Sequence, residues 1–233
     1  LLPVRHPLQA AEQVAVLDRL SGGRVILGVG RGYATAMFSA FSVSRTEKRE
    51  IFRACLDVMA SAWRGESVAV DETSEPVMLS PLPVQKPHPP IWFGGRHPDA
   101  LKRAVKYGDG WMGAGSTTSD QFVEHMGIIK KELDDKVDIV LSDMAPSASG
   151  HRNTDQTRSL LLAELAFDAT IKLLNKDGVF CCKLIRGKGE EELIKIMRGY
   201  FSSIKRFKPE SSRKDSAEIF IIGLNFNDKS WRN

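Results

Sequence analysis

Cysteine is scarce in this sequence: only three occur in 233 residues, and two of them, Cys181 and Cys182, are neighbours in an apolar stretch. Neither Cys-x-x-Cys nor His-x-x-x-His spacing occurs, and the five histidines are scattered. These absences argue against a disulfide framework and against a zinc-type metal site. We therefore expect reduced thiols, a cytoplasmic compartment and no bound metal.

Long hydrophobic runs are also missing. No apolar stretch approaches the roughly 18 residues of a membrane-spanning helix, so no membrane association is expected. The sequence starts Leu1-Leu2-Pro3 without a methionine, which suggests a fragment or a processed product. Its hydrophobic content of 42% is ordinary for a globular protein, and its length allows one large domain or two small ones.

The first part of the chain has no net charge, and the positive excess lies in the last part. Residues 136–233 contain 17 Lys and Arg against 13 Asp and Glu, whereas residues 1–135 are balanced. A basic cluster beside a site favours a phosphate-bearing partner such as RNA, and a solvated lysine-rich face is the alternative. The residues predicted to contact RNA are Lys205, Arg206, Lys208, Arg213 and Lys214.

Helix-like and strand-like segments alternate along the chain. Helices are predicted near residues 11–20, 47–63, 98–107, 120–133, 154–174 and 189–201. Strands are predicted near residues 24–30, 90–95, 110–114, 137–142, 178–184, 203–207 and 217–224, with a loop or hairpin excursion at 66–90. The alternation indicates parallel βα units, too few for a closed eight-stranded barrel. We therefore predict an open, mostly parallel α/β sheet with helices on both faces (Rossmann-like) and an antiparallel last strand.

Three polar residues stand at the ends of successive hydrophobic segments. Asp143 follows segment 137–142, Lys183 closes the next one, and Glu218 begins the last. Ligands of open α/β sheets bind at the carboxyl ends of the strands, and an antiparallel last strand brings Glu218 to that edge. A lysine between two carboxylates can orient a hydroxyl and help it lose its proton. Turn, strand-end and edge-strand roles are the structural alternatives.

Motifs spread over residues 136–227 form a specific set. They are Ser142-Asp143-Met144-Ala145-Pro146 with Ser149-Gly150, Cys182-Lys183-Leu184 with Gly187, and Lys208-Pro209-Glu210-Ser211-Ser212-Arg213 leading to Glu218. This set resembles the second half of the FtsJ-type ribosomal RNA 2′-O-ribose methyltransferases. The resemblance implies S-adenosylmethionine as methyl donor, ribosomal RNA as substrate, and a Lys-Asp-Lys-Glu tetrad whose last three members match Asp143, Lys183 and Glu218. It also implies that Asp143 lies at the cofactor.

The first half of such a methyltransferase has no counterpart upstream of residue 136. The nearest glycine loop, Gly28-Val-Gly30-Arg-Gly32-Tyr33, has tyrosine where the last glycine of G-x-G-x-x-G belongs. The family's first catalytic lysine is not matched either. An incomplete methyltransferase site is the expectation.

Residues 3–132 carry a second set of motifs. The segments are Arg5-His6-Pro7-Leu8, Leu17-Asp18-Arg19-Leu20-Ser21-Gly22-Gly23-Arg24, Leu27-Gly28-Val29-Gly30-Arg31-Gly32, Pro87-His88-Pro89-Pro90-Ile91-Trp92-Phe93-Gly94-Gly95 and Gly108-Asp109-Gly110-Trp111. They resemble the bacterial-luciferase-like monooxygenases and their deazaflavin-dependent relatives. The resemblance implies FMN or a deazaflavin as cofactor, with backbone amides at Gly94 and Gly95 near its phosphate. A tight strand-to-helix turn is the structural alternative for these glycines.

A composite chain accounts for both resemblances. It would join a luciferase-like partial barrel segment (residues 1–135) to a methyltransferase-like half-domain (136–233) around residues 128–137, and the two could merge into one α/β domain. Three functions stay open: a remnant S-adenosylmethionine-dependent RNA 2′-O-ribose methyltransferase without full activity, a flavin- or deazaflavin-dependent oxidoreductase, and an inactive scaffold with weak RNA binding. The oligomeric state is not predicted.

Overall fold

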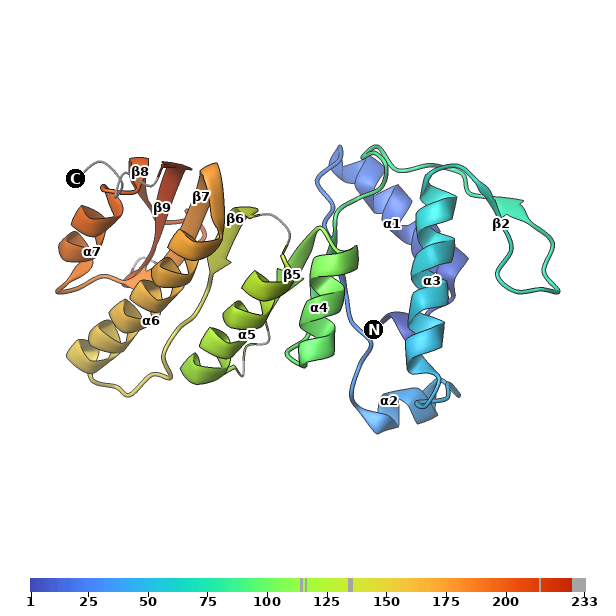
Figure 1. The fold of residues 1–233 in the computed structure, drawn as a ribbon, viewed down its shortest axis with the longest axis horizontal. Helices are drawn as coiled ribbons and strands as arrows, with labels where there is room; N and C mark the ends of the chain where they lie inside the picture. The colour runs from blue at the N-terminus through green and yellow to red at the C-terminus, as the bar shows by residue number, and fades with distance from the viewer. Residues whose placement is uncertain (114, 116, 134–135, 214, 228–233) are drawn as a thin grey trace. The chain divides into compact units, whose positions relative to one another are not determined.

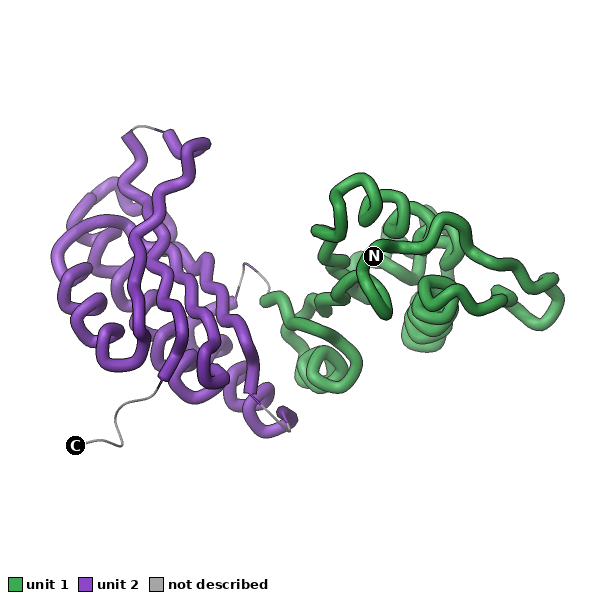
Figure 2. The backbone as a smooth tube through the Cα atoms, turned by 90° about the horizontal axis from the view of Figure 1, so that it is seen from above, with its two compact units in different colours: residues 1–114 green, residues 115–233 purple. Residues whose placement is uncertain are grey.

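The protein is described here by a computed structural model that covers residues 1–113, 115, 117–133, 136–213 and 215–227. It divides into two compact units, unit 1 (Leu1–Ala114) and unit 2 (Gly115–Asn233), coloured green and purple in Figure 2. The described strands of the two units belong to separate sheets. This division reflects which residues contact one another, and it does not test where two family-like segments were joined. The expected join near residues 128–137 therefore remains a prediction.

Unit 1 contains a parallel three-stranded sheet with the order β1-β4-β5. Its strands are β1 (Leu27–Val29), β4 (Ile91–Gly94) and β5 (Gly110–Met112). Leu27 pairs with Ile91 and Trp92 pairs with Gly110, so all three strands point the same way. Their carboxyl ends, and the loops that follow β1 and β4, therefore meet at one edge of the sheet.

The described part of unit 1 also contains five helices. They are the 3-10 helix η1 (Leu2–Val4) and the α-helices α1 (Pro7–Ser21), α2 (Thr35–Ala40), α3 (Lys48–Trp63) and α4 (Pro98–Tyr107). Trp63 is fully buried at the end of α3, and its indole Nε1 donates a 2.9 Å hydrogen bond to the Ala11 carbonyl oxygen of α1. Phe52 of α3 meets Phe93 of β4 edge-on with ring centroids 5.9 Å apart. These contacts fix α1 and α3 on one hydrophobic core.

Several boundaries in unit 1 follow from their sequence signals. The helix α1 stops at Gly22, which is left-handed at φ 66°, a conformation that glycine adopts without penalty. The predicted excursion 66–90 contains only a short antiparallel pair, β2 (Ser67–Val68) with β3 (Val77–Met78). The strand predicted at 24–30 is shorter than expected, because only Leu27–Val29 finds a partner in β4.

Unit 2 contains a four-stranded sheet with the order β6-β7-β9-β8. The strands are β6 (Val137–Ser142), β7 (Leu174–Ile185), β8 (Phe201–Phe207) and β9 (Glu218–Phe226). β6 is parallel to β7, and β9 is antiparallel to both β7 and β8. The predicted antiparallel last strand is confirmed.

One face of this sheet forms the core of unit 2. Phe180, Cys182 and Leu184 of β7 and Ile219 and Ile221 of β9 are buried on it. The helices of the unit are α5 (Ser119–Glu132), α6 (Arg152–Leu173) and α7 (Glu190–Met197). Both α6 and α7 contribute buried residues to this same core, and α5 packs against α6. Figure 1 shows α6 lying along β6 and β7.

The fold class is confirmed: the chain is α/β, with a parallel sheet flanked by helices, and the described residues form no closed barrel. Among the described helices, none combines the length and apolar character required to cross a bilayer.

Candidate functional site

The strand register brings the three predicted catalytic residues of unit 2 together. Ser142 pairs with Cys182, so the next residues, Asp143 and Lys183, continue in step along parallel β6 and β7. Glu218 pairs with Ile185 at the beginning of antiparallel β9. The start of β9 therefore lies beside the end of β7, as the antiparallel direction requires.

Direct contacts follow from this register. The Lys183 ammonium Nζ lies 2.6 Å from Asp143 Oδ1 and 3.8 Å from Glu218 Oε1. The Lys183 side chain is only 17% exposed, whereas the side chains of Asp143 and Glu218 are 79% and 50% exposed. The cation is thus largely shielded by protein, while both carboxylates remain open to an incoming polar ligand. We call these three residues the trio.

The loop after β6, which begins with Asp143, is fixed to the start of α6. The Asp155 carboxylate accepts hydrogen bonds from the Ser149 hydroxyl at 2.7 Å and from the Ser149 amide at 3.0 Å. These bonds lower the pKa of Asp155 from its ordinary value. At neutral pH the carboxylate is therefore charged, and it holds the loop in place.

The loop after β7 is held against the same helix. Gln156 Nε2 donates a 2.7 Å hydrogen bond to the Arg186 carbonyl oxygen. A Cβ at Gly187 would come within 2.4 Å of the Gln156 side chain, so only glycine fits this approach without a shift. Together these bonds hold the loops after β6 and β7 against α6.

The trio can bind and orient a hydroxyl group. A protonated lysine side chain has three N–H donors, and the flanking carboxylate oxygens are acceptors only. A hydroxyl between them would meet a cation and a proton acceptor at once, which is the arrangement that general base catalysis needs. The geometry therefore suits removal of a hydroxyl proton, and the roles of the three residues stay a prediction.

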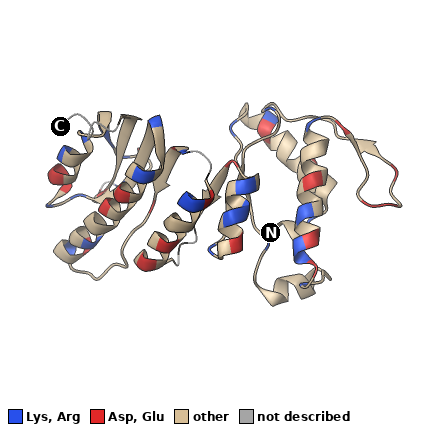
Figure 3. Cartoon of the chain, in the orientation of Figure 1, with Lys and Arg blue, Asp and Glu red and all other residues tan. Residues whose placement is uncertain are grey.

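The five cations predicted to contact RNA differ in their surroundings. Lys205 is exposed on β8, and Arg213 is exposed in the loop before β9. Lys208 donates a 2.9 Å hydrogen bond from Nζ to the Ser216 carbonyl oxygen. Lys214 lies outside the described residues. Figure 3 shows that Asp and Glu are interspersed with the basic residues of the helices.

Arg206 is held by carboxylates. Its Nε donates a 2.7 Å hydrogen bond to Glu190 Oε1, and its NH2 group contacts Glu191. The Glu190 side chain is only 9% exposed and also lies near Arg186. Arg206 is therefore compensated by two carboxylates at the start of α7.

Gly94 and Gly95 lie at the carboxyl end of β4 in unit 1. Gly95 has φ 137°, a backbone region that favours glycine, and a Cβ there would come within 2.9 Å of the Ala100 side chain. Its carbonyl oxygen accepts a 2.8 Å hydrogen bond from Trp111 Nε1. The turn that glycine permits is thus present, and the predicted phosphate contact remains a prediction.

A cluster of cations near Gly94 and Gly95 was not predicted. It joins the loop after β1 (Arg31), the first turn of α3 (Lys48 and Arg49) and α4 (Arg103), and we call it the cation cluster. The pKa values of Arg31, Lys48 and Arg103 are each lowered from the ordinary value. Burial is the largest cause, and neighbouring positive charges add to it.

The cation cluster is partly compensated: Asp99 and Glu50 act on Arg31, and Arg103 NH1 donates a 3.3 Å hydrogen bond to the Asp99 carbonyl oxygen. The Nε atom of Arg103 is buried and, among the described residues, has no hydrogen-bond partner. Its guanidinium lies over the Phe52 ring, 5.6 Å from the centroid. The nearest carboxylate contact of Arg49 is a long one, 4.0 Å to Asp99. An anion bound here would be stabilised, because it would offset the repulsion between these positive charges.

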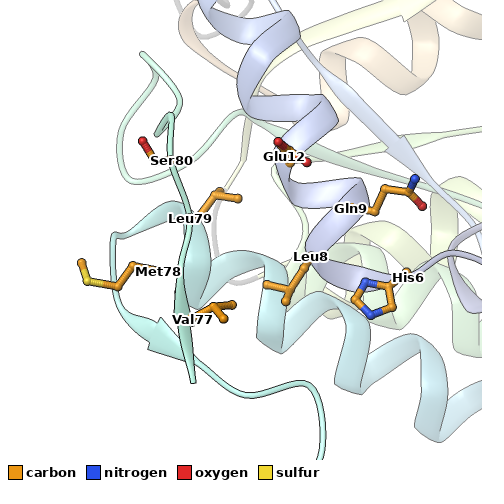
Figure 4. Close-up of a pocket in the computed structure, with 8 residues that line it drawn as sticks. All are labelled: His6, Leu8, Gln9, Glu12, Val77, Met78, Leu79 and Ser80. Atoms are coloured by element: carbon orange, nitrogen blue, oxygen red, sulfur yellow. The ribbon is translucent and has the colours of Figure 1, made fainter. Parts of the chain in front are cut away.

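A surface depression of about 580 Å³ lies elsewhere on unit 1 (Figure 4). One wall is the start of α1 with the residue before it, and the other is the segment from Val77 to Ser80. None of the predicted site residues lines it, and its lining contains no Lys or Arg. The depression therefore has no part in the sites described above.

The fold and these contacts define an α/β protein whose described residues place polar clusters in both units. The sequence model of the luciferase-like monooxygenase family matches residues 1–174, three quarters of the chain, so the chain belongs to this family. The match extends beyond residue 132, where the sequence resemblance was expected to end, and includes β6 and α6.

Curated relatives supply the second similarity. Ribosomal RNA large subunit methyltransferase E of Rickettsia bellii (strain RML369-C) is 49% identical over 98 residues, which are 42% of this chain and 43% of the relative. The enzyme of that name from Ehrlichia chaffeensis (strain ATCC CRL-10679 / Arkansas) is 41% identical over 95 residues, 41% of this chain and 45% of the relative. The match thus spans less than half the length of these relatives.

Solved structures also resemble the chain. The monooxygenase RslO1 from Streptomyces bottropensis has a TM-score of 0.52 at 19% identity, covering 74% of this chain and 56% of its own. At that identity the likeness concerns the fold alone. The double resemblance predicted from the motifs, to luciferase-like monooxygenases and to ribosomal RNA methyltransferases, is confirmed.

Proposed function

We propose that the chain is a composite without full activity, and that its best preserved chemistry is that of an S-adenosylmethionine-dependent 2′-O-ribose methyltransferase of ribosomal RNA, working in the cytoplasm. The observation that carries the proposal is the 2.6 Å contact between Lys183 Nζ and Asp143, with Glu218 beside it. In this role Lys183 orients the ribose hydroxyl, and the two carboxylates position Lys183.

The residues beside the trio do not complete a site for S-adenosylmethionine. The glycine segment at residues 28–32 includes the end of β1, which pairs with β4 in the sheet of unit 1. A Cβ at Gly32 would meet the Leu1 side chain at 2.0 Å, so this loop packs closely against the first residue. In the described sheet of the trio, the loop after β7 contains Gly187 and Gly189 but does not complete a G-x-G-x-x-G pattern, and this mismatch supports the expected loss of full activity.

A graft tests the chemistry of the trio independently of the missing cofactor pocket. Residues 136–227 would replace the matching segment of a methyltransferase E relative, and tritiated methyl transfer to ribosomal RNA would be measured. We expect transfer by the graft, and a loss of about 100-fold or more on Lys183→Ala, since a group that orients the reacting hydroxyl and helps it lose its proton contributes about that much. The chain itself should transfer methyl groups only at background level.

Lys188→Ala is the matched control, because Lys188 is an exposed lysine in the loop after β7. It should leave the graft's rate within about twofold, as expected for a surface change away from the site. A Lys183→Ala graft as active as its parent would exclude the proposed role of the trio.

A second candidate function rests on the cation cluster. Arg31, Lys48 and Arg103, beside Gly94 and Gly95, have the charge and the unpaired donor that fit the phosphate of FMN or a deazaflavin. A bound flavin or deazaflavin would supply hydride transfer there. The chain's own residues would bind the phosphate and fix the position of the ring system.

Binding of FMN can be compared with binding of riboflavin, which has no phosphate, by flavin fluorescence. We expect FMN to bind at least about tenfold more tightly, since a charge-assisted contact contributes about 1.5–3 kcal/mol. Arg31→Ala should abolish this preference. Arg53→Ala, on an exposed side chain of α3 paired with Asp57, should preserve it. Equal affinity for the two flavins would exclude a phosphate site.

A further inference from the structure

The sheet of unit 2 has one face turned toward α6 and α7 and one turned away from them. Phe180 and Cys182 of β7 are buried in the core to which both helices contribute. Side chains alternate between the two faces of a strand, so Cys181 and Lys183 of β7 lie on the other face. Leu141 of β6 is in register with Cys181 on that face and is 60% exposed. We call this side of the sheet the open face.

A row of three side chains crosses the open face from the trio to the β8 edge of the sheet. Lys183 of β7 is in register with Phe220 of β9, and Phe220 is in register with Phe207 of β8. Neighbouring strands are about 4.8 Å apart, so the backbone of Phe207 lies only about 10 Å from that of Lys183 along the row. Phe220 is partly buried, and Phe207 is 50% exposed. Two aromatic rings therefore stand beside the position where the trio would hold a hydroxyl group.

A cation accompanies the aromatic rings. Lys205 of β8 is exposed, and it lies on the same face as Phe207 because one residue separates the two. That residue, Arg206, is held on the other side of the sheet by Glu190 at the start of α7. An exposed cation beside an exposed aromatic ring suits a ligand that has both a phosphate and a flat ring. A single-stranded nucleic acid has both, and aromatic side chains on a sheet face are a common platform for unpaired bases.

We propose that the bases of a single-stranded RNA stack on Phe220 and Phe207, with the phosphate backbone beside Lys205. This contact rests on the proposed function, because it places the bases next to the ribose whose hydroxyl group meets the trio. The two rings bind the strand, and Lys183 remains the group that meets the hydroxyl. Every base has a flat face, so the rings add affinity without selecting a particular base.

Fluorescence anisotropy of two short labelled RNA strands with the full chain tests the proposal. One strand carries its bases, and the other has the same backbone charge with abasic sites in their place. We expect the strand with bases to bind at least about fivefold more tightly, since stacking of one base on an aromatic ring contributes about that much or more.

Variants of Phe207 separate stacking from charge. Phe207→Ala should weaken binding of the strand with bases at least about fivefold and leave the affinity for the abasic strand unchanged. Phe207→Trp keeps an aromatic ring and should retain the parent affinity. Phe207→Leu keeps the apolar volume without the ring, and it serves as the second variant should Phe207→Ala not fold. Lys205→Ala should weaken both strands alike and reduce the slope of log affinity against log salt by about 0.7.

Phe41→Ala is the matched control, because Phe41 is a phenylalanine of similar exposure, 54%, in unit 1. It should leave both affinities unchanged. The proposal is overturned by equal affinity for the two strands, or by an equal loss in Phe41→Ala. It is equally overturned if neither strand binds up to about 100 µM, the weak limit of non-specific nucleic-acid binding. Methyl transfer is not measured here, so a failure of stacking is distinct from a failure of the trio in the graft.

Discussion

Replacement of Phe180 with alanine is expected to lower the free energy of unfolding of unit 2 by about 3–5 kcal/mol. Phe180 of β7 is 0% exposed and lies at the centre of an aromatic group. Its ring stacks on Phe201 at 6.3 Å and 19°, and its centroid lies 5.9 Å from that of Phe167. The change removes these contacts and leaves a cavity that the surrounding rings fill only in part.

Urea unfolding followed by far-ultraviolet circular dichroism measures this loss. Phe207→Ala is the matched control, since Phe207 is 50% exposed at the end of β8. We expect the control to change the free energy by about 0.5–1 kcal/mol, which is typical of a half-exposed position. Similar losses in the two variants would mean that the aromatic group is not the core of unit 2.

Replacement of Asp18 with alanine is expected to destabilise unit 1 by about 1–3 kcal/mol, because it removes the acceptor of two part-buried hydrogen bonds from Gln85. Asp18 of α1 is 0% exposed. Its carboxylate accepts hydrogen bonds from the Gln85 amide at 2.9 Å and from Gln85 Nε2 at 2.7 Å. These bonds attach the excursion at residues 66–90 to α1, so the loss should appear in the unfolding of unit 1.

The Asp18 contribution should depend on pH. Burial raises the pKa of its carboxyl, but the hydrogen bonds from Gln85 and the neighbouring backbone outweigh burial, so the pKa is lowered from 3.8. A lowered folded-state pKa stabilises the protein above the unfolded-state value, and that stability is lost as the pH falls through the folded-state value. Urea midpoints measured from neutral pH into this acid range should therefore fall less steeply for Asp18→Asn than for the parent.

Asp57→Asn provides the comparison for that pH series. Asp57 is 74% exposed and forms only a 3.9 Å surface pair with Arg53. Its replacement should leave the steepness of the parent curve unchanged. Identical curves for Asp18→Asn and the parent would show that the buried carboxylate does not couple folding to protonation.

Helices with clear start and stop signals could be predicted closely from the sequence. The helix predicted at 98–107 is α4 (Pro98–Tyr107), which begins with a proline and is followed by Gly108. The short helix α2 was missed, since its six residues are too few to show a helical apolar period. Strand β7 begins earlier than the predicted residue 178, because Leu174 already pairs with Val137. Pairing with a neighbouring strand is a tertiary property, and local sequence does not contain it.

The trio could be predicted from the sequence, whereas the cation cluster could not. Asp143, Lys183 and Glu218 stand at strand ends, and strand direction alone places strand ends at one edge. The cation cluster joins a loop and two helices, so its members meet only through packing that no sequence spacing shows. The ion pairs of Arg206 with Glu190 and Glu191 are of this second kind.

The ion pairs of Arg206 have a consequence for any encounter with RNA. A cation that already holds two carboxylates displaces few counterions when a phosphate approaches. For single strands each neutralised phosphate contributes about 0.7 to the slope of log affinity against log salt, so five phosphate contacts would give a slope of about −3.5. With Arg206 engaged by its own helix, the attainable slope falls to about −2.8. Affinity for RNA would therefore weaken less with rising ionic strength than the basic residues of the sequence suggest.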